Sequence, residues 1–278
     1  MNPPAVWLAP AKLNLFLHIT GQRADGMHEL QTVFQFLDMC DELTFAPRED
    51  GSIYLQDGIE GVPAEDNLIV RAARALQVHC GTTQGADISL LKRLPAGGGL
   101  GGGSSDAATT LVALNQLWAC GLGKNELAGL GLKLGADVPI FVHGHAAWAE
   151  SIGEKFEPVD PPEPWFLVIQ PAIQVSTAEI FSAPELTRDC PPITIRDFLS
   201  GQATNVCEPV VRKRYPAVDM ALKWLEKYAS ARMTGTGSCI FAAFESESQA
   251  IDILHKMPDA WQGFVARGCN QSPLYRDR

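Results

Sequence analysis

The chain lacks the features that mark several large classes of protein. Basic residues are outnumbered by acidic ones, 22 Lys and Arg against 32 Asp and Glu, which gives a formal charge of −10. A chain with this negative charge has no overall electrostatic attraction to nucleic acid or to an anionic membrane. No apolar run reaches the ~18 residues of a membrane span, and residues 1–10 lack the basic segment of a secretion signal. Any anionic ligand must therefore be bound by a local site.

Motifs of cysteine chemistry are also missing. Seven cysteines are scattered over the chain, and none of them forms a C-x-x-C pair. This spacing argues against a disulfide framework and against a zinc site. We therefore expect reduced, mostly packed thiols in a soluble, cytoplasmic protein that binds neither nucleic acid nor membranes. The 278 residues are enough for one large domain or two moderate ones with a buried core.

The most informative segment that is present covers residues 94–108, where six glycines run directly into a helical pattern. Glycine lets the backbone take positive φ and approach a ligand closely, and the first amides of the following helix are unpaired. We expect Ser104 or Ser105 to cap this helix, whose apolar residues recur at helical spacing. The pattern predicts a phosphate cradle. The alternative is a flexible Gly/Ser connector, but a connector would not need to be followed by an amphipathic helix.

Three familiar phosphate-binding designs do not fit this loop. Gly97, Gly99 and Gly102 satisfy G-x-G-x-x-G, but a Rossmann unit needs an acidic residue about 20 positions further on, and the chain has Gly121-Leu122-Gly123 there. The P-loop pattern G-x-x-x-x-G-K-[ST] is absent, as are the H-R-D and D-F-G motifs of protein kinases. The loop therefore belongs to another phosphate-handling design.

Strand and helix patterns alternate irregularly, which favours an α+β fold with helices packed against an antiparallel sheet. Strands are expected at residues 6–19, 29–39, 42–45, 52–56, 87–91, 146–151, 165–170, 239–244 and 263–266. Helices are expected from residue 68, after the glycine loop, at residues 124–134, 217–229 and 247–256, and as short pieces between residues 177 and 211. The proline-dense run 158–164 is the best linker candidate, and we place a domain boundary near it.

Three further segments carry groups that could serve catalysis. Lys12 and Asn14 are two positions apart in an otherwise apolar strand, so they share a face. Buried there, they would need a partner or a ligand, although taken alone the pattern favours a solvent-exposed face. Asp137 is typical of a turn, but beside Lys12 it would stay ionised and could accept a hydroxyl proton. Residues 233–238 are either a β-turn or a backbone surface that closes over phosphate or substrate.

Taken together, these segments resemble the GHMP kinase superfamily. The resemblance rests on residues 10–15, the glycine loop, residues 135–139 and residues 234–237. Residues 23–32, 66–69 and 270–274 resemble the branch of that superfamily whose acceptor alcohol carries a cytidine diphosphate. The matching segments follow one another in the family's order from about residue 10 to residue 273, so the resemblance covers nearly the whole chain.

The resemblance implies a two-domain α+β architecture. An N-terminal ATP-binding domain of the ribosomal protein S5 domain 2-like fold would cover residues 1–155. A C-terminal ferredoxin-like substrate domain would cover residues 156–278, with its last residues packed back on the first domain. The implied reaction is phosphorylation, with ATP and Mg²⁺, of the 2-hydroxyl of cytidine-diphosphate methylerythritol in non-mevalonate isoprenoid synthesis, by a monomer or weak homodimer.

The resemblance also implies the site residues. Asp137 would be the base and Lys12 its charged partner, and no metal ligand is assigned. The ATP-binding positions would be Asn67, Lys92, Pro95, Gly97, Gly98, Gly99, Gly101, Gly102, Gly103, Ser104, Ser105 and Asp106. The substrate-binding positions would be Asn14, Met27, His28, Thr177 and Phe181. Met27 stands where such kinases often have an aromatic residue, which puts the strength of a cytosine sandwich with Phe181 in doubt.

Two alternatives remain at this point. One is a GHMP kinase for another alcohol, such as homoserine or mevalonate, against which His28 and Phe181 argue. The other is a catalytically silent nucleotide-binding module. The presence of both Lys12 and Asp137 argues against it, because a module that only binds ATP has no use for that pair.

Overall fold

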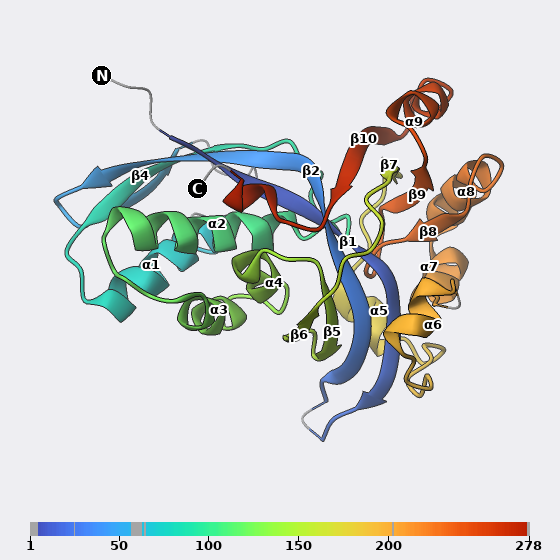
Figure 1. The fold of residues 1–278 in the computed structure, drawn as a ribbon, viewed down its shortest axis with the longest axis horizontal. Helices are drawn as coiled ribbons and strands as arrows, with labels where there is room; N and C mark the ends of the chain where they lie inside the picture. The colour runs from blue at the N-terminus through green and yellow to red at the C-terminus, as the bar shows by residue number, and fades with distance from the viewer. Residues whose placement is uncertain (1–4, 25, 57–62, 64, 202, 277–278) are drawn as a thin grey trace.

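The computed structural model describes residues 5–24, 26–56, 63, 65–201 and 203–276. Asp25, in one of the segments that resemble the family, lies outside these residues. Figure 1 shows two lobes connected by the long antiparallel strands β1 (Val6–Gln22) and β2 (His28–Arg48). Strand β1 begins in the N-terminal lobe and the antiparallel β2 ends there, and both extend between it and the C-terminal lobe, so side chains on them can face both.

The N-terminal lobe places four helices against one face of a sheet (Figure 1). Its further strands are β3 (Ile53–Gln56), β4 (Gly85–Leu91), β5 (Ala147–Ser151) and β6 (Lys155–Pro158). Its helices are α1 (Leu68–Cys80), α2 (Gly102–Leu117), α3 (Lys124–Leu132) and α4 (Val138–His143). Strands β4 and β5 both pair antiparallel with β2, and β3 pairs parallel with β4. One hydrophobic core lies between this sheet and the helices.

The C-terminal lobe follows the β-α-β-β-α-β order of ferredoxin-like folds. Its strands are β7 (Trp165–Gln170), β8 (Ala231–Met233), β9 (Ile240–Phe244) and β10 (Gln262–Cys269), in the antiparallel order β10-β7-β9-β8. Its helices are α5 (Thr177–Ser182), α6 (Ile195–Leu199), α7 (Glu208–Arg214), α8 (Pro216–Leu225) and α9 (Glu247–Leu254). The α+β architecture expected from the sequence is confirmed.

The end of β10 joins the two lobes. Gly268 pairs with Leu37 and Cys269 with Phe36 of β2, so the ten strands of the described residues form one continuous sheet. The short 3₁₀ helix η1 (Pro273–Tyr275) then packs against α4, where the Tyr275 hydroxyl donates to the carbonyl oxygen of Val142. The last described residues therefore return to the N-terminal lobe.

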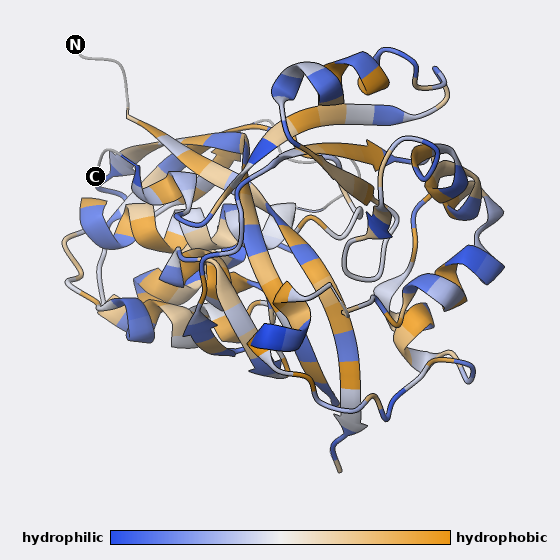
Figure 2. Cartoon of the chain, turned by 45° about the vertical axis from the view of Figure 1, so that its right-hand side comes forward, coloured by the Kyte–Doolittle hydropathy of each residue, from blue (hydrophilic) through white to orange (hydrophobic). Residues whose placement is uncertain are grey.

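Hydrophobic side chains gather where the elements meet. In Figure 2 the central strands are largely hydrophobic, and hydrophilic residues concentrate on the outer helices and loops. Strand β1 is buried along most of its length. Lys12 and Asn14 are 3% and 4% exposed, so the interpretation that their face is open to solvent is wrong. The cause is the burial of β1 beneath α2, the glycine loop and the C-terminal lobe, which no local pattern reveals.

Several local predictions need correction. Residues 42–45 continue β2 and do not form a separate strand. Ser104 and Ser105 lie inside the first turn of α2, whose N-cap is Gly101 without a side-chain hydrogen bond. The predicted helix at residues 124–134 ends at Leu132. The short elements α4, β6 and β8 were not predicted, because pieces of three to six residues carry little periodicity of their own.

The expected thiol chemistry is confirmed: all seven cysteines are free, and five of them are buried. Burial raises the pKa of Cys239 to about 12, so this thiol is neutral near pH 7. Among the helices of the described chain, none combines the length and apolar character needed to cross a membrane.

Candidate active site

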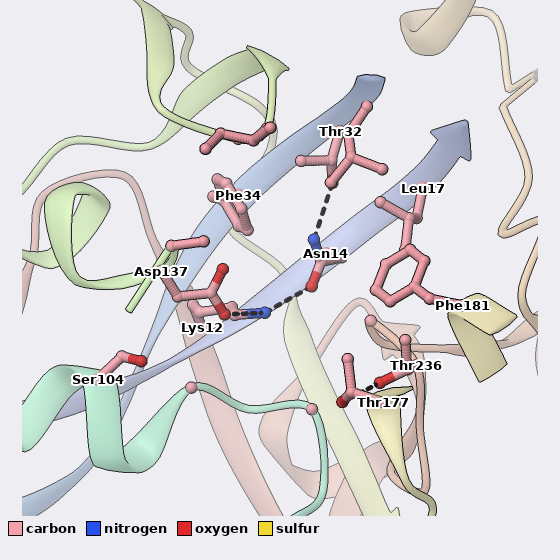
Figure 3. Close-up of a pocket in the computed structure, with 17 residues that line it drawn as sticks. Lys12, Asn14, Leu17, Thr32, Phe34, Ser104, Asp137, Thr177, Phe181 and Thr236 are labelled. Carbon is pink, nitrogen blue, oxygen red and sulfur yellow. Dashed lines mark hydrogen bonds and ion pairs between the residues drawn. The ribbon is translucent and has the colours of Figure 1, made fainter. Parts of the chain in front are cut away.

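Lys12 on β1 and Asp137 at the start of α4 are in contact. Lys12 Nζ lies 3.2 Å from Asp137 Oδ2, as Figure 3 shows. The Lys12 side chain is 4% exposed and that of Asp137 is 36% exposed. The ammonium is therefore buried against its partner, while the carboxylate opens toward solvent. Asp137 caps no backbone group of α4, so its side chain stays available to the cavity.

Asn14 and its neighbours hold the Lys12 ammonium in place. Lys12 Nζ donates to Asn14 Oδ1 at 2.6 Å, and Asn14 Nδ2 donates to Thr32 Oγ1 on β2 at 3.0 Å. The ammonium also lies 5.2 Å from the centre of the Phe34 ring, a distance suited to a cation–π contact. The backbone nitrogen of Asn14 donates to Thr234 Oγ1 at 2.9 Å. Contacts from three segments thus satisfy a charge that would be costly to bury alone.

The glycine loop, residues 97–103, runs against the strand that carries this pair. Gly99 and Gly101 have φ of 80° and 73°, in the region that favours glycine. A Cβ at Gly101 would lie 3.1 Å from Lys12 Cε. The backbone nitrogen of Lys12 donates to the carbonyl oxygen of Leu100 at 3.0 Å. The loop and the catalytic candidate are therefore held together by backbone contact.

A second loop, residues 233–238, packs on the glycine loop from the C-terminal lobe. A Cβ at Gly99 would lie 2.5 Å from the carbonyl oxygen of Thr234, and one at Gly98 would lie 2.4 Å from Cys239 Sγ. The backbone nitrogen of Cys239 donates to the carbonyl oxygen of Gly98 at 3.1 Å. Packing between the two loops thus requires glycine at positions 98 and 99, whether or not a ligand also approaches the backbone there.

These groups border a cavity of about 310 Å³. Figure 3 shows Lys12 and Asp137 near one end of it and Thr177, Phe181 and Thr236 near the other. The polar groups and glycines on its wall are Lys12, Asn14, Thr32, Gly99, Gly101, Ser104, Asp137, Gly153, Thr177, Gly235 and Thr236. Both lobes contribute, so the cavity exists only because of their assembly.

The far end of the cavity carries groups suited to a sugar or polyol. Thr177, at the start of α5, and Thr236 have their hydroxyl oxygens 2.8 Å apart. Each hydroxyl can donate or accept a hydrogen bond, so the pair can bind a substrate hydroxyl that acts as acceptor or as donor.

An adjoining cavity of about 420 Å³ shares Phe181 with the first and is also lined by Met27 and His28. The His28 and Phe181 rings are stacked with centres 5.1 Å apart and planes at 24°. Arg188 Nε donates to His28 Nε2 at 3.2 Å. Burial, together with the Arg188 charge, lowers the pKa of His28, so the imidazole is neutral at pH 7. The ring stacked on Phe181 is thus His28, while Met27 is 46% exposed.

Lys92 lies on the other side of the glycine loop and contacts two carboxylates. Its Nζ is 2.6 Å from Asp41 Oδ2 and 2.7 Å from Asp106 Oδ2. Asp41 Oδ1 also accepts from the backbone nitrogens of Arg93 and Leu94, at 2.6 and 2.8 Å. Burial outweighs the attraction of Lys92 and raises the pKa of Asp106 to about 7. This cluster fixes the chain where it enters the glycine loop.

Several buried polar atoms near the start of α2 have no hydrogen-bond partner within the described chain. Asn67 caps α1 through its Oδ1, which accepts from the nitrogen of Ile69 at 2.9 Å, but its Nδ2 is unpaired. Ser105 Oγ and Asp106 Oδ1 are unpaired as well. Buried polar groups in proteins are nearly always hydrogen-bonded. These three atoms are therefore candidates for contact with a ligand.

The predicted site residues fall into groups. Those that line the main cavity are Lys12, Asn14, Gly99, Gly101, Ser104, Asp137, Thr177 and Phe181. Met27 and His28 line the adjoining cavity, and Lys92 and Pro95 line a separate one of about 280 Å³. The residues that line none of these three are Asn67, Gly97, Gly98, Gly102, Gly103, Ser105 and Asp106.

Sequence reasoning missed four residues that shape the site: Thr32, Phe34, Asp41 and Arg188. Asp41 had no clear signal, since Asp38 and Glu42 lie close to it in the sequence and the patterns predicted a break there between two strands. Thr32 and Phe34 matter because of the register of β1 against β2. The contact between Arg188 and His28 joins segments far apart in the chain, and no local pattern indicates it.

The donor set fits a metal that arrives with phosphate. Within the ranges that the structure describes, no three His, Cys, Asp or Glu side chains cluster to hold a metal ion. Mg²⁺ usually takes one or two carboxylates and completes its shell with substrate phosphates and water. Asp137 and Ser104 line the same cavity and offer one carboxylate and one hydroxyl. They fit that mode of binding.

Comparison with known proteins adds independent findings. Residues 67–145 match the family described as "GHMP kinases N terminal domain", and residues 194–263 match "GHMP kinases C terminal". A protein of Nitrosococcus oceani named 4-diphosphocytidyl-2-C-methyl-D-erythritol kinase is 60% identical over 269 residues, which covers 97% of this chain and 96% of the relative. A protein of the same name from Pseudomonas paraeruginosa is 60% identical over 268 residues, with 96% and 95% covered.

Solved structures are similar as well. A crystal structure of 4-(cytidine 5'-diphospho)-2C-methyl-D-erythritol kinase superimposes with a TM-score of 0.82 at 30% identity, covering 95% of this chain and 99% of the other. The mevalonate kinase of Methanococcus jannaschii gives a TM-score of 0.70 at 16% identity, covering 97% and 99%. The second likeness shows a shared fold and nothing about the substrate.

Proposed function

Since the chain belongs to the GHMP kinases, and within them to the family of 4-diphosphocytidyl-2-C-methyl-D-erythritol kinases, we propose that it transfers the γ-phosphoryl group of ATP to the 2-hydroxyl of that alcohol. The products are the 2-phosphate and ADP, in the non-mevalonate synthesis of isoprenoid precursors. The observation that carries the proposal is the contact of Lys12 with Asp137 in a cavity between the glycine loop and Phe181.

Asp137 is proposed to act on the acceptor hydroxyl. Its carboxylate is 36% exposed, opens to the cavity and is held by Lys12 at 3.2 Å. A positioned carboxylate can accept the hydroxyl proton as the oxygen attacks phosphorus. The Lys12 ammonium stabilises the ionised carboxylate and adds positive charge where the transferring phosphoryl group gathers negative charge.

The glycine loop and the start of α2 are proposed to bind the triphosphate. Gly99 and Gly101 present backbone at the cavity, and the N-terminus of a helix of 16 residues favours an anion. Mg²⁺, which would be held by Asp137, Ser104 and the phosphates, would neutralise the charge that develops during transfer. Asn67 and Ser105 offer unpaired polar atoms for the nucleoside.

The acceptor is proposed to lie between the lobes. Thr177 and Asn14 face the alcohol, while His28, Phe181 and Met27 line the adjoining cavity, which takes the cytosine. The neutral His28 ring, oriented by Arg188, can hydrogen-bond to a pyrimidine edge. Groups from both lobes would thus bind the cytidine end of the acceptor.

The structure also suggests a refined domain boundary. A boundary between residues 155 and 156 would fall within β6, which pairs with β5 of the N-terminal lobe. We place it in the proline-dense run, residues 159–164, so that β6 stays with its partner strand.

An ADP-release assay with three alcohols tests the function. We expect turnover with 4-diphosphocytidyl-2-C-methyl-D-erythritol and none with homoserine or mevalonate. Turnover of either of the latter at a comparable rate would overturn the substrate assignment. ATP binding without turnover of any alcohol would favour the silent nucleotide-binding module.

A further inference from the structure

Residues 233–238, the end of β8 and most of the loop that follows it, contact the acceptor side of the site at two places. Thr234 Oγ1 accepts from the backbone nitrogen of Asn14 at 2.9 Å. Thr236 lines the main cavity, and its hydroxyl lies 2.8 Å from that of Thr177. Any displacement of this loop would therefore move part of the wall against which the acceptor binds.

Asn205 holds this loop from the side away from the cavity. Its Nδ2 donates to the carbonyl oxygens of Met233 and Gly235, both at 2.8 Å. Its Oδ1 accepts from the backbone nitrogen of Cys207 at 2.9 Å. The side chain is 8% exposed. Both amide hydrogens and the amide oxygen are thus committed, so a rotation of this side chain would break all three hydrogen bonds.

The segment around Asn205 is itself attached to β1. The nitrogen of Leu17 donates to the carbonyl oxygen of Thr204 at 3.0 Å, and the nitrogen of Val206 donates to that of Leu17 at 2.9 Å. Strand β1 carries Lys12. Asn205 therefore fixes the loop relative to the strand that bears the candidate catalytic lysine.

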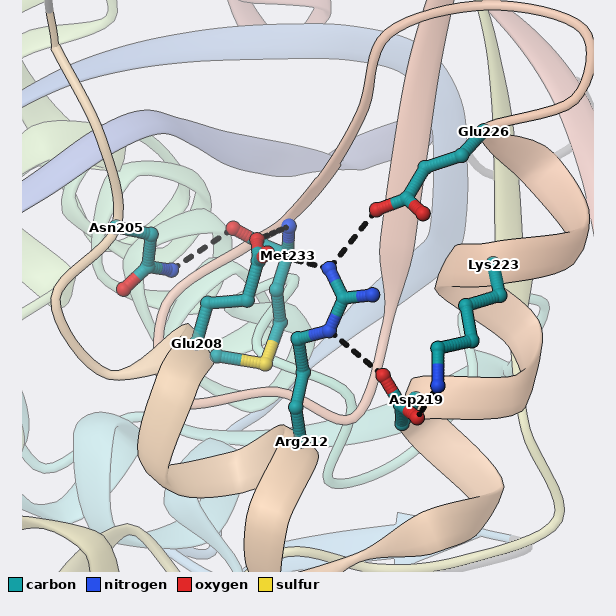
Figure 4. A network of polar contacts seen from close by, with 7 residues as sticks. All are labelled: Asn205, Glu208, Arg212, Asp219, Lys223, Glu226 and Met233. Carbon is teal, nitrogen blue, oxygen red and sulfur yellow. Dashed lines mark hydrogen bonds and ion pairs between the residues drawn. The ribbon is translucent and has the colours of Figure 1, made fainter.

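Glu208, at the start of α7, is a second tether. Its Oε2 accepts from the backbone nitrogen of Met233 at 3.0 Å, and its Oε1 accepts from Arg212 Nη1 at 3.3 Å. Arg212 continues to Asp219 Oδ1 at 2.7 Å and to Glu226 Oε1 at 2.8 Å (Figure 4). Hydrogen bonds from Lys223 and then Arg212 lower the pKa of Asp219, which keeps the outer part of the network charged. The network orients the carboxylate that holds the first residue of the loop.

We propose that Asn205 and Glu208 are positioning residues of the phosphoryl transfer. They hold residues 233–235 by three backbone groups, and thereby place Thr234 against Asn14 and Thr236 at the acceptor wall. Neither side chain lines the main cavity, so both act through the loop. The inference deepens the proposed function and rests on it, because the consequence is a loss of acceptor alignment.

Asn205→Ala is the first test, measured with 4-diphosphocytidyl-2-C-methyl-D-erythritol and ATP. We expect the acceptor KM to rise ~10-fold and kcat to fall ~10-fold, since misplacement by about 1 Å can cost up to ~100-fold in rate. The KM for ATP should change less than about threefold, because the glycine loop keeps its hydrogen bond from Lys12 of β1 to Leu100. A variant with a lower Tm but an unchanged acceptor KM would show that Asn205 is merely structural.

Glu208 gives a second test with a built-in rescue. In Glu208→Gln an oxygen still accepts from Met233, whereas Glu208→Ala removes the tether. Both variants weaken the contact with Arg212 and should lose stability, but only the alanine variant should raise the acceptor KM. Equal KM values in the two variants would refute the proposal, and this pair decides the matter if Asn205→Ala does not fold.

Glu226→Ala is the matched control. Glu226 contacts Arg212 at the far end of the same network and has a side chain 40% exposed. Its removal should lower Tm slightly and leave both KM values and kcat unchanged. A rise in acceptor KM here would mean that the network, and not the two tethers, controls alignment.

Hydrogen exchange separates failure of this inference from failure of the proposed function. Amides of residues 233–238 should exchange slowly in the unmodified protein and faster in Asn205→Ala and Glu208→Ala, whatever the substrate. If the unmodified protein does not turn over the cytidyl alcohol, the function is wrong. Unchanged exchange in both variants, with turnover intact, would overturn the tethering alone.

Discussion

Two lysines lie on either side of the glycine loop, and both contact carboxylates. A Cβ at Gly101 would meet Lys12 at 3.1 Å, and one at Gly102 would meet Lys92 at 3.2 Å. Lys12 pairs with the partly exposed Asp137, whereas both carboxylates that contact Lys92 are at most 1% exposed. Both lysines thus contact carboxylates, but the carboxylate beside Lys12 is open to solvent and those beside Lys92 are enclosed.

The difference in exposure separates two roles. A carboxylate that opens to a cavity can reach a substrate hydroxyl, and its ion pair keeps it oriented. Carboxylates that are enclosed bind mainly to the protein itself, although Asp106 Oδ1 is left without a partner there. Their desolvation is costly, and removal of one partner is strongly destabilising. We therefore expect changes at Lys12 and Asp137 to affect turnover, and changes around Lys92 to affect stability.

Asp137→Ala should give the largest effect on the open side. We expect kcat to fall ~100-fold or more, as is typical for loss of a general base, with a much smaller loss of ATP affinity, because Ser104 and the phosphates would still hold Mg²⁺. Steady-state kinetics and calorimetric titration with ATP measure the two quantities, and Asp137→Asn is the size-matched control. A parallel loss of nucleotide affinity and turnover would make Asp137 structural and would remove the contrast between the two sides.

Asp41→Ala should give the largest effect on the closed side. It removes the partner of Lys92 and the acceptor for the nitrogens of Arg93 and Leu94. We expect a loss of about 3 kcal/mol in the free energy of unfolding, measured by denaturant titration. Asp41→Asn keeps an acceptor oxygen and should lose less. If Asp41→Ala has unchanged stability but low kcat, the assignment of roles is reversed.

Asp106→Asn tests the enclosed side further, because its effect on stability should depend on pH. The pKa of Asp106 is raised to about 7 in the folded protein against 3.8 as its ordinary value. The folded state therefore holds the proton more tightly, and stability falls as pH rises from about 4 to about 7. Asn cannot ionise, so the stability of the variant relative to the original chain should rise by roughly 2–3 kcal/mol between pH 5 and pH 8.

Thermal unfolding at pH 5 and pH 8 measures this gain for Asp106→Asn. Asp87→Asn is the control, since Asp87 is half exposed and pairs with Arg48 at the surface. It should show little difference between the two pH values. If the difference in stability between Asp106→Asn and the original chain is the same at both pH values, folding does not raise the pKa of Asp106.

Met27→Tyr should give the smallest effect, confined to the cytidine end. An aromatic ring at this exposed position beside Phe181 would add a stacking face that methionine lacks. We expect the KM for the cytidyl alcohol to fall about threefold, with kcat unchanged. Val78→Tyr, at an exposed position on α1, is the control. A KM that does not change would show that His28 already supplies the stacking on Phe181.

Local patterns predicted the position of the glycine loop and most of the elements around it. The helix that begins at Leu68, the strand that carries Lys12 and the helix after the glycines all follow from neighbouring residues. Asp41 was missed because it falls between the strands predicted at residues 29–39 and 42–45, which form one strand in the structure. The Asn205 tether gave no local sign, because an asparagine before a helix is ordinarily a cap or a turn.

What the sequence determined by itself is local: a glycine run that leads into a helix, strands and helices with their own periodicity, and motifs in the order of one kinase family. The tertiary structure alone decided which lysine meets the open carboxylate and which is enclosed, and it alone brought Asn205 and Glu208 to residues 233–235. Local preferences act over a few residues. These contacts depend on the register of β1 against β2 and on the packing of two lobes, which only the folded chain as a whole can establish.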